Sequence, residues 1–180
     1  MELVPIFDHP KPTLYAIRYG GETDEFHRLF ELWQDPEYLR SFFKEHQNDL
    51  EKGFYKTSIN NAVRNTLEEA QRLEDRIFDC CEKGHYDLTH SLQSFFQALR
   101  NDDYKLYSLQ KTKGRQRWLR LYAVRIDVNL YVISGGAIKL TKRMEDRKHT
   151  QNEKYKLDQT VEYLKSLNLI DPDDFDVLEI

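Results

Sequence analysis

Near residue 104 the hydrophobic period changes from helical to alternating, and this change limits the folds available to the chain. Between residues 26 and 99, apolar side chains recur three and four residues apart, as they do on amphipathic helices. Between residues 104 and 141 they alternate with polar side chains, as they do on strands. Helices followed by strands with short connections predict an α+β fold, with a C-terminal antiparallel β-meander packed on helices. With 180 residues, we expect a single domain, 1–180.

The first half of the chain, 22–100, is predicted to be acidic and mainly helical. Before it, residues 13–19 (TLYAIRY) alternate as a strand and end at two glycines. The long helix of this half is expected to end at Gly84, where a left-handed cap is common. Helix starts are marked by capping residues or proline, at Thr23 or Asp24, Pro36, Ser58, and Asp87 or Thr89.

The second half, 104–170, is predicted to hold the meander and a terminal helix. The clearest strand is WLRLYAVRI, residues 118–126. The glycine pair 135–136 lies inside the last strand pattern, where it forms either a bulge or a hairpin turn. The other elements expected here are a strand at 104–110, a basic turn at 111–117 centred on Gly114, a tight connection at 127–129, a strand at 130–141, a helix at 149–169 and an acidic tail at 171–180.

Positive charge is concentrated in the predicted meander. Residues 105–148 contain 12 Lys and Arg against 3 Asp and Glu, a net charge of +9, whereas the whole chain has a net charge of −4. Residues 1–104 have a net charge of −8 and residues 149–180 a net charge of −5. Such asymmetry indicates a polyanionic or acidic protein partner. The alternative is a solvated sheet edge that lysine and arginine protect against aggregation.

Strand alternation predicts which side chains of the meander share a face. Leu119, Leu121 and Ala123 are expected to face the core, and Trp118, Arg120, Tyr122 and Val124 the other side. Arg117 and Arg125 alternate in phase with the core-facing residues, but they lie at the ends of the strand, where we expect them to reach water. The outer surface would then present Arg120, Tyr122, Lys139, Lys142 and Arg143 together.

This surface has the residue types that bind RNA. Arginine and lysine bind phosphates, and a tyrosine ring stacks on a base. The basic block lacks a cluster of carboxylates suited to a metal, so RNA cleavage here is expected to be metal-independent, with the 2′-hydroxyl attacking its own phosphate. We predict catalytic roles for Arg120, Tyr122, Lys139 and His149, and RNA binding by Lys113, Arg115, Arg117, Arg125, Lys142 and Arg143. For His149, the alternative is an exposed residue at a helix start.

Three segments resemble the RelE/ParE toxin superfamily, especially its HigB-like, phage Gp49-like branch, and RelE-like uncharacterised proteins of Bacteroidetes. They are RWLRLYAVRI, GGAIKLTKRM and HTQNEKYKLDQ. In this resemblance Arg120 or Arg125 matches the family's strand arginine, and Lys139 matches the first lysine of a pair whose second position is Leu140 here. The chain departs from the family in its length and its acidic helical half.

The resemblance implies the toxin of a toxin–antitoxin system, an mRNA endonuclease that acts at the ribosome and is neutralised by an antitoxin covering the sheet. The alternative is a non-catalytic module whose basic sheet binds an acidic protein partner. A further hypothesis is that the acidic tail, 171–180, covers the basic surface as a phosphate mimic.

Other classes of function find no support in the sequence. Nucleotide-binding and hydrolase motifs are absent, and we expect neither a metal nor a small-molecule cofactor. No apolar run approaches membrane-spanning length, and residues 1–12 lack the pattern of a signal peptide. The only cysteines are the adjacent Cys80 and Cys81 in a helical pattern, so we expect a cytoplasmic, reduced protein without a membrane partner.

Overall fold

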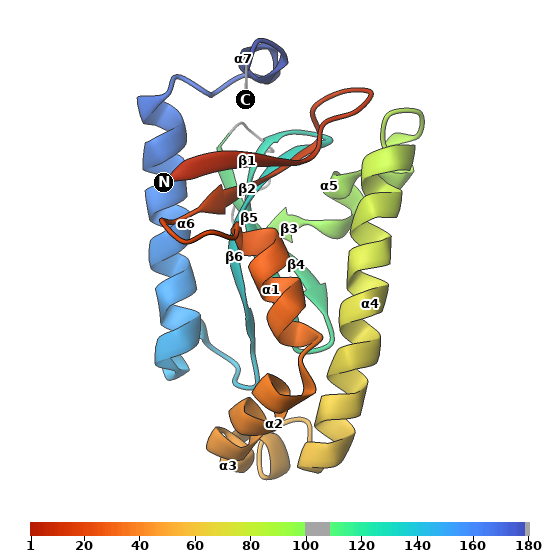
Figure 1. The fold of residues 1–180 in the computed structure, drawn as a ribbon, viewed down its shortest axis with the longest axis vertical. Helices are drawn as coiled ribbons and strands as arrows, with labels where there is room; N and C mark the ends of the chain where they lie inside the picture. The colour runs from red at the N-terminus through yellow and green to blue at the C-terminus, as the bar shows by residue number, and fades with distance from the viewer. Residues whose placement is uncertain (100–108, 179–180) are drawn as a thin grey trace.

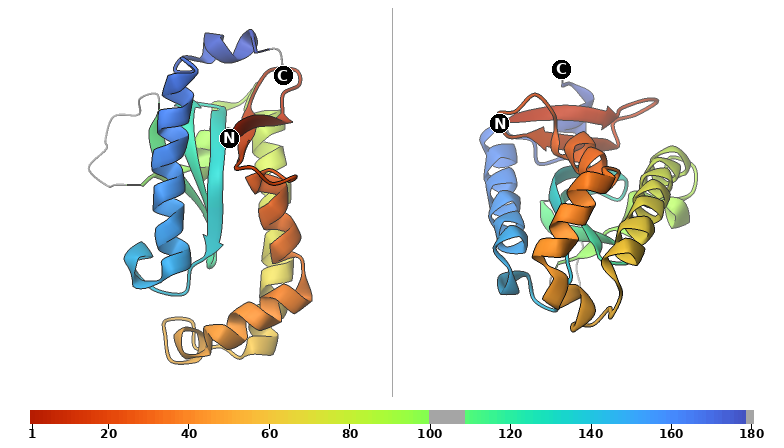
Figure 2. Two further views of the ribbon diagram at one scale, coloured as in Figure 1. Left: turned by 60° about the vertical axis from the view of Figure 1, so that its left-hand side comes forward. Right: turned by 60° about the horizontal axis from the view of Figure 1, so that its bottom comes forward.

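A mixed sheet runs through the middle of the molecule, with helices on both of its faces (Figures 1 and 2). The computed structural model describes residues 1–99 and 109–178, and within these residues the sheet has six strands in the order β1-β2-β6-β5-β4-β3. Strands β2 and β6 pair in parallel, and every other neighbouring pair is antiparallel. The strands are β1 (Glu2–Phe7), β2 (Leu14–Arg18), β3 (Gln97–Ala98), β4 (Gln110–Gln116), β5 (Leu119–Asp127) and β6 (Leu130–Ile138).

The helices confirm the predicted α+β class and the terminal helix. Helices α1, α2 and α4 lie on one side of the sheet, and α6 lies on the other (Figure 2). None of the helices in the described ranges is both long and apolar enough to cross a membrane. Their bounds are α1 (Glu25–Trp33), α2 (Pro36–Glu45), α3 (Gln47–Glu51), α4 (Ile59–Lys83), η1 (Leu88–His90), α5 (Leu92–Phe95), η2 (Met144–Asp146), α6 (Lys148–Ser166) and α7 (Pro172–Asp176).

Three helices begin where the capping residues predicted. The Asp24 carboxylate accepts hydrogen bonds from the N–H groups of Phe26 and His27 at 2.9 and 3.1 Å. Pro36 opens α2, and Ser58 caps α4. Such side-chain acceptors satisfy N–H groups that have no partner inside the helix. Gly84 does end α4, but its φ of −62° is right-handed, so the expected left-handed cap is wrong.

Two apolar clusters hold the helices to the two faces of the sheet. On one face, Leu119, Leu121 and Ala123 of β5 pack with α1, α2 and α4, as their alternation predicted. On the other face, Tyr122 and Val124 pack with α6. We expected Tyr122 to lie on an outer surface of the sheet. This expectation is wrong, because the apolar stripe of α6 buries that part of the face.

Strands β5 and β6 follow the predicted meander, and the glycine pair of β6 forms a bulge instead of a hairpin. Tyr122 pairs with Gly135 and Ala123 pairs with Ile133, which leaves Ser134 as the extra residue. The strand therefore continues to Ile138, and the backbone N–H of Lys139 still bonds the Trp118 carbonyl at 2.8 Å. Lys139 thus stays beside β5.

The predicted basic turn at 111–117 is wrong, because this segment is strand β4. It pairs with β5 from Gln110–Arg125 to Gln116–Leu119. The chain reverses at Arg117 instead, where φ is +50°. Gly114 is a packing position, since a Cβ there would lie 1.9 Å from the Phe95 ring. Of the predicted strand at 104–110, residues 104–108 lie outside the described residues.

Candidate polyanion-binding cavity

A cavity of about 530 Å³ opens on the α6 side of the sheet, bordered by β4, β5, α6 and the segment after β6. Of the described residues, six cationic side chains and two carboxylates line it, together with apolar side chains and one tyrosine. The lining residues are Lys111, Lys113, Arg120, Lys139, Lys142, Lys154, Glu145, Asp158, Leu99, Leu109, Tyr122, Met144 and Leu157.

Strand pairing brings the central cations together. Lys113 pairs with Tyr122, and residues directly opposite on antiparallel strands project from the same face. Arg120 pairs with Ala137 on the other side, so the period of two places Lys139 on this face as well. Three cations from three consecutive chain segments therefore converge on one cavity.

Backbone carbonyls, and not carboxylates, hold two of these cations in place. One Nη atom of Arg120 donates to the carbonyl oxygens of Arg117 and Leu119, at 2.8 Å each. Lys139 Nζ donates to the Thr141 carbonyl at 2.9 Å and also to the Lys142 carbonyl. These bonds fix the position of the groups without neutralising their charge.

The two carboxylates of the cavity are engaged at its rim. Asp158 forms an ion pair with Lys111, and Glu145 lies 3.7 Å from Lys154. Within the described part of the chain, Lys113, Arg120 and Lys139 have no carboxylate partner. Among the described residues, the centre of the cavity therefore carries positive charge that no ion pair compensates, although Asp146 and Glu145 act on Lys139 from a distance.

The pKa values of the central groups reflect the burial of these charges and their repulsion by one another. Burial, followed by the nearby Arg120 and Arg115 charges, lowers the pKa of Lys113. Burial, followed by the Arg120 and Lys113 charges, lowers the pKa of Lys139. Burial also lowers the pKa of Arg120 and raises that of Tyr122 to about 12. A bound anion would relieve this repulsion, so the cavity is suited to a phosphate or carboxylate group.

The cavity unites half of the residues predicted from the sequence. Its lining includes Arg120, Tyr122, Lys139, Lys113 and Lys142. Tyr122 is only 1% exposed, so the expectation of an open ring for stacking is wrong, and the ring is part of the cavity wall.

Three predicted arginines lie at the surface outside the cavity. Arg115 is exposed opposite Arg120, and its charge acts on Lys113. Arg117 lies with its guanidinium 4.9 Å from the centre of the Trp118 ring. Arg143 is exposed and begins η2. These residues extend the basic surface without lining the cavity.

Arg125, His149 and Trp118 are not placed as predicted. Arg125 is only 6% exposed, so the expectation that it reaches water is wrong. His149 faces a different cleft, where its Nε2 lies 3.0 Å from the Ile138 carbonyl. Trp118 packs on the α4 side, with its Nε1 donating to Thr66 at 2.9 Å, because the turn at Arg117 rotates it out of the strand alternation.

Lys111 and Lys154 are cavity residues that the sequence did not single out. The composition of residues 111–117 predicts a turn at Lys111, although Lys111 alternates with the buried Thr112. Lys154 lies one helical turn before Asp158 and three residues before the buried Leu157, so it flanks the sheet-facing stripe of α6. That spacing is the sequence signal for its position.

The acidic tail does not cover the cavity within the described residues. Helix α7 packs through Phe175 on Tyr15, with ring centroids 5.3 Å apart. No residue of α7 lines the cavity. The described part of the tail thus gives no support to the phosphate-mimic hypothesis.

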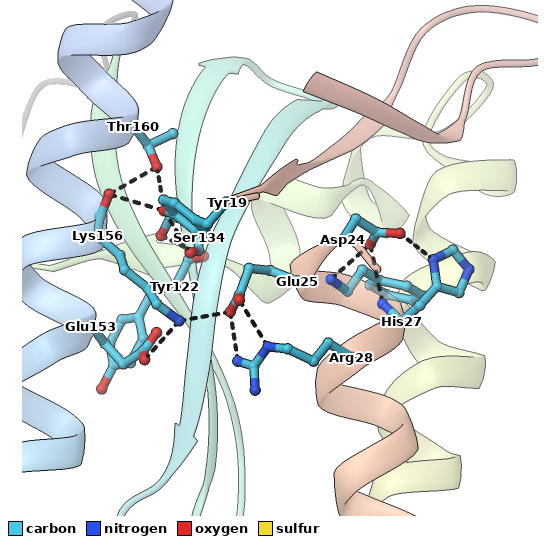
Figure 3. A network of polar contacts seen from close by, with 11 residues as sticks. Tyr19, Asp24, Glu25, His27, Arg28, Tyr122, Ser134, Glu153, Lys156 and Thr160 are labelled. Atoms are coloured by element: carbon cyan, nitrogen blue, oxygen red, sulfur yellow. Dashed lines mark hydrogen bonds and ion pairs between the residues drawn. The ribbon is translucent and has the colours of Figure 1, made fainter. Parts of the chain in front are cut away.

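A second polar cluster lies on the other side of α6, at the bulge of β6 (Figure 3). Lys156 Nζ lies 2.9 Å from a Glu25 oxygen and 3.3 Å from Glu153, and Arg28 donates two hydrogen bonds to Glu25. Burial raises the pKa of Glu153 to about 7, with Lys156 opposing this shift. Opposite charges compensate each other here and join α6 to α1. These residues come from α1 and α6, which are far apart in the sequence, so local periodicity gives no sign of the cluster.

Comparison with family models, with curated proteins and with solved structures found no match to this chain.

Proposed function

We propose that the chain is a cytoplasmic RNA-binding protein of the RelE-like type, which holds a backbone phosphate in the basic cavity and cleaves mRNA without a metal ion. The observation that carries the proposal is the convergence of Lys113, Arg120 and Lys139, none of which forms an ion pair with a carboxylate in the part of the chain that the structure describes. RNA supplies the missing negative charge as a row of phosphates. The resemblance of residues 117–141 to RelE-like toxins is the basis for proposing mRNA cleavage as the reaction and an antitoxin as the partner.

The three cations have different roles in this proposal. Arg120 is fixed by two carbonyls and stabilises the charge that develops on the phosphate. Lys139 uses two of its three N–H groups on carbonyls and has one left for an oxygen of the phosphate. Lys113, whose pKa burial lowers, makes no bond to a carbonyl among the described residues and is assigned to accept the proton of the 2′-hydroxyl; as the bond from phosphorus to the 5′-oxygen breaks, that proton returns to the leaving oxygen.

Binding and cleavage are tested separately. Binding is measured by fluorescence anisotropy with a labelled single-stranded RNA over a salt titration. We expect log affinity to fall linearly with log salt concentration, and the double variant Lys113→Met, Arg120→Met to bind about 100-fold more weakly, with a slope smaller by about 1 to 2. Lys165→Met is the matched control, because this exposed lysine of α6 pairs with Glu162 and does not line the cavity.

Cleavage is tested by inducing the protein in a bacterial host and in a translating extract. Growth arrest and cut mRNA, both abolished by Lys113→Met, would support the enzyme. RNA binding without cleavage would remove the catalytic part of the proposal and keep the binding part. Failure to bind RNA, together with capture of an acidic protein by the same cavity, would favour the non-catalytic module instead.

A further inference from the structure

The loop between α3 and α4, residues 52–58, carries an aromatic side chain into solvent. It lies at the end of the molecule where α2 and α3 pack beyond the sheet (Figure 1). Phe54 is 78% exposed. The loop backbone is tightly built, because a Cβ at Gly53 would lie 2.1 Å from the Asp49 carbonyl oxygen and because Lys56 has a φ of +46°. The backbone on both sides of Phe54 is thus constrained, and the ring is presented at a defined place.

Tyr55 connects this loop to the basic cavity. Its hydroxyl donates to the Arg117 carbonyl at 3.3 Å, and Nη1 of Arg120 donates to the same oxygen atom at 2.8 Å. Burial lowers the pKa of Arg120, and Tyr55 opposes this shift, as expected for two groups that lie side by side. The Phe54 ring lies 5.3 Å from the Tyr55 ring, measured between centroids. A single side chain therefore links the exposed ring to the central arginine of the cavity.

Exposed cations without an ion pair flank the two rings. They are Lys52 and Lys56 of the loop, and Arg115 and Arg117 at the turn from β4 to β5. Within residues 1–99 and 109–178, none of the four forms an ion pair with a carboxylate. The Arg117 guanidinium and the Tyr55 ring both pack on Trp118, at 4.9 and 5.0 Å from its ring centre. This end of the molecule therefore extends the positive charge of the cavity outward.

Two carboxylates close to these residues are engaged by other side chains. Glu51 ends α3 and accepts a hydrogen bond from Gln47 at 2.9 Å. Glu69 of α4 accepts a hydrogen bond from Gln116 and lies 3.4 Å from Arg72. A single exposed apolar side chain is common on proteins, but an exposed ring among cations is typical of sites that bind single-stranded nucleic acid.

We propose that Phe54 is a base-binding subsite, on which an unpaired RNA base stacks while Arg120 holds the neighbouring phosphate in the cavity. A ring so exposed has a free face, and every base has a π-face, so the subsite requires no particular base. The bases of a duplex stack on one another, so the subsite selects single-stranded RNA. This inference rests on the proposed function, because the phosphate in the cavity determines where the base lies.

The experiment combines a change in the RNA with a change in the protein. Fluorescence anisotropy measures the affinity of the whole protein for a labelled single-stranded RNA, and for the same strand with abasic sites, which keeps every phosphate. We expect the wild type to bind the strand with bases about tenfold more tightly, the effect of one stacked base. In Phe54→Ala we expect the two strands to bind within about twofold of each other, because the base and the ring act as one contact.

Two further variants control for the ring and for its place. Phe54→Trp keeps an aromatic face and is expected to keep the preference for the strand with bases. Tyr86→Ala removes a ring that is 86% exposed just beyond the other end of α4, and is expected to leave both affinities unchanged. A preference that persists in Phe54→Ala, or that disappears in Tyr86→Ala, would overturn the subsite.

The salt dependence separates the failure of this inference from the failure of the proposed function. Phe54→Ala removes no phosphate contact, so the slope of log affinity against log salt concentration should equal that of the wild type. Suppose the slope falls in the double variant Lys113→Met, Arg120→Met while Phe54→Ala binds both strands as the wild type does. The cavity then binds RNA, and only the base subsite is wrong. If the wild type binds neither strand, the proposed function is wrong and the subsite is wrong with it.

Discussion

Helix α6 separates two groups of buried charge that are organised in opposite ways. On the bulge side, Lys156 lies between the carboxylates of Glu25 and Glu153, and each charge has a partner of the other sign. On the cavity side, Lys113, Arg120 and Lys139 face one another, and none of them forms an ion pair with a carboxylate of the described residues. Paired charges at a helix contact serve structure, whereas like charges left together at a cavity indicate an absent partner. The same substitution, lysine to methionine, is therefore expected to have opposite effects on the two sides.

Lys156→Met is expected to have the largest effect, a loss of about 3 kcal/mol of unfolding free energy, because it removes the cation that pairs with the buried Glu153, whereas Glu25 keeps Arg28. Urea denaturation at neutral pH measures it. The exposed Lys165→Met on the same helix is the control, with a change below about 0.5 kcal/mol. A loss as small as that of the control would remove the contrast between the two sides.

Glu153→Gln is expected to change how stability depends on pH. The pKa of Glu153 is about 7 in the folded protein, above its ordinary value of 4.5, so the folded state keeps a proton that the unfolded state releases. Stability contributed by that proton is complete below pH 4.5 and is lost as the pH rises through 7. The unfolding free energy of the glutamine variant, relative to that of the wild type, should therefore increase between pH 4 and pH 8, by up to about 3 kcal/mol. If the unfolding free energies of the two proteins change with pH in parallel, folding does not raise the pKa of Glu153.

Lys113→Met is expected to stabilise the fold by up to about 1 kcal/mol, because it removes repulsion from Arg120 and Arg115. The gain should shrink when salt screens the charges, which a denaturation series at two ionic strengths would show. Destabilisation at low salt would mean that Lys113 is paired and that the cavity is already neutralised.

Lys111→Met is expected to have the smallest effect, within about 0.5 kcal/mol of the wild type. Its ion pair with Asp158 joins two side chains that are roughly half exposed, and such surface pairs contribute little. Thermal unfolding is the measurement. A large loss would show that the rim of the cavity is held as firmly as the bulge side.

The sequence predicted the elements best where local patterns and tertiary packing agree. The alternation in WLRLYAVRI fixes the core face of β5, and the caps at Asp24 and Ser58 mark helix starts. Strand β4 was missed because its Lys, Arg and Gly content is typical of a turn, although pairing with β5 makes it a strand. Strand β1 was missed because Pro5 weakens a strand pattern, yet β1 is an edge strand, where proline is tolerated.

Only those parts of the candidate site that depend on the alternation of side chains along a strand could be predicted from the sequence. Parity placed Arg120 and Lys139 on one face, and the structure brings them into one cavity. It gave no information on the position of α6, which buries Tyr122 and carries His149 into the other cleft. The rotation of a helix about a sheet depends on contacts distant in sequence, so Glu153 and its network were not visible in the local pattern either.

The extra residue in β6 determines which of the two sides Lys139 belongs to. Ile133 faces α1, and an uninterrupted alternation from it would also point residues 135, 137 and 139 toward α1. Ser134 shifts the phase by one, so Gly135 meets Glu153 of α6 and Lys139 enters the basic cavity. If Ser134 instead paired regularly with β5, every side chain that follows it in the strand would change face. Lys139 would then point into the packed core and Ala137 and Ile138 would exchange faces, although no charged residue had been altered. Deletion of Ser134, by contrast, would remove the bulge and leave each later side chain on its present face.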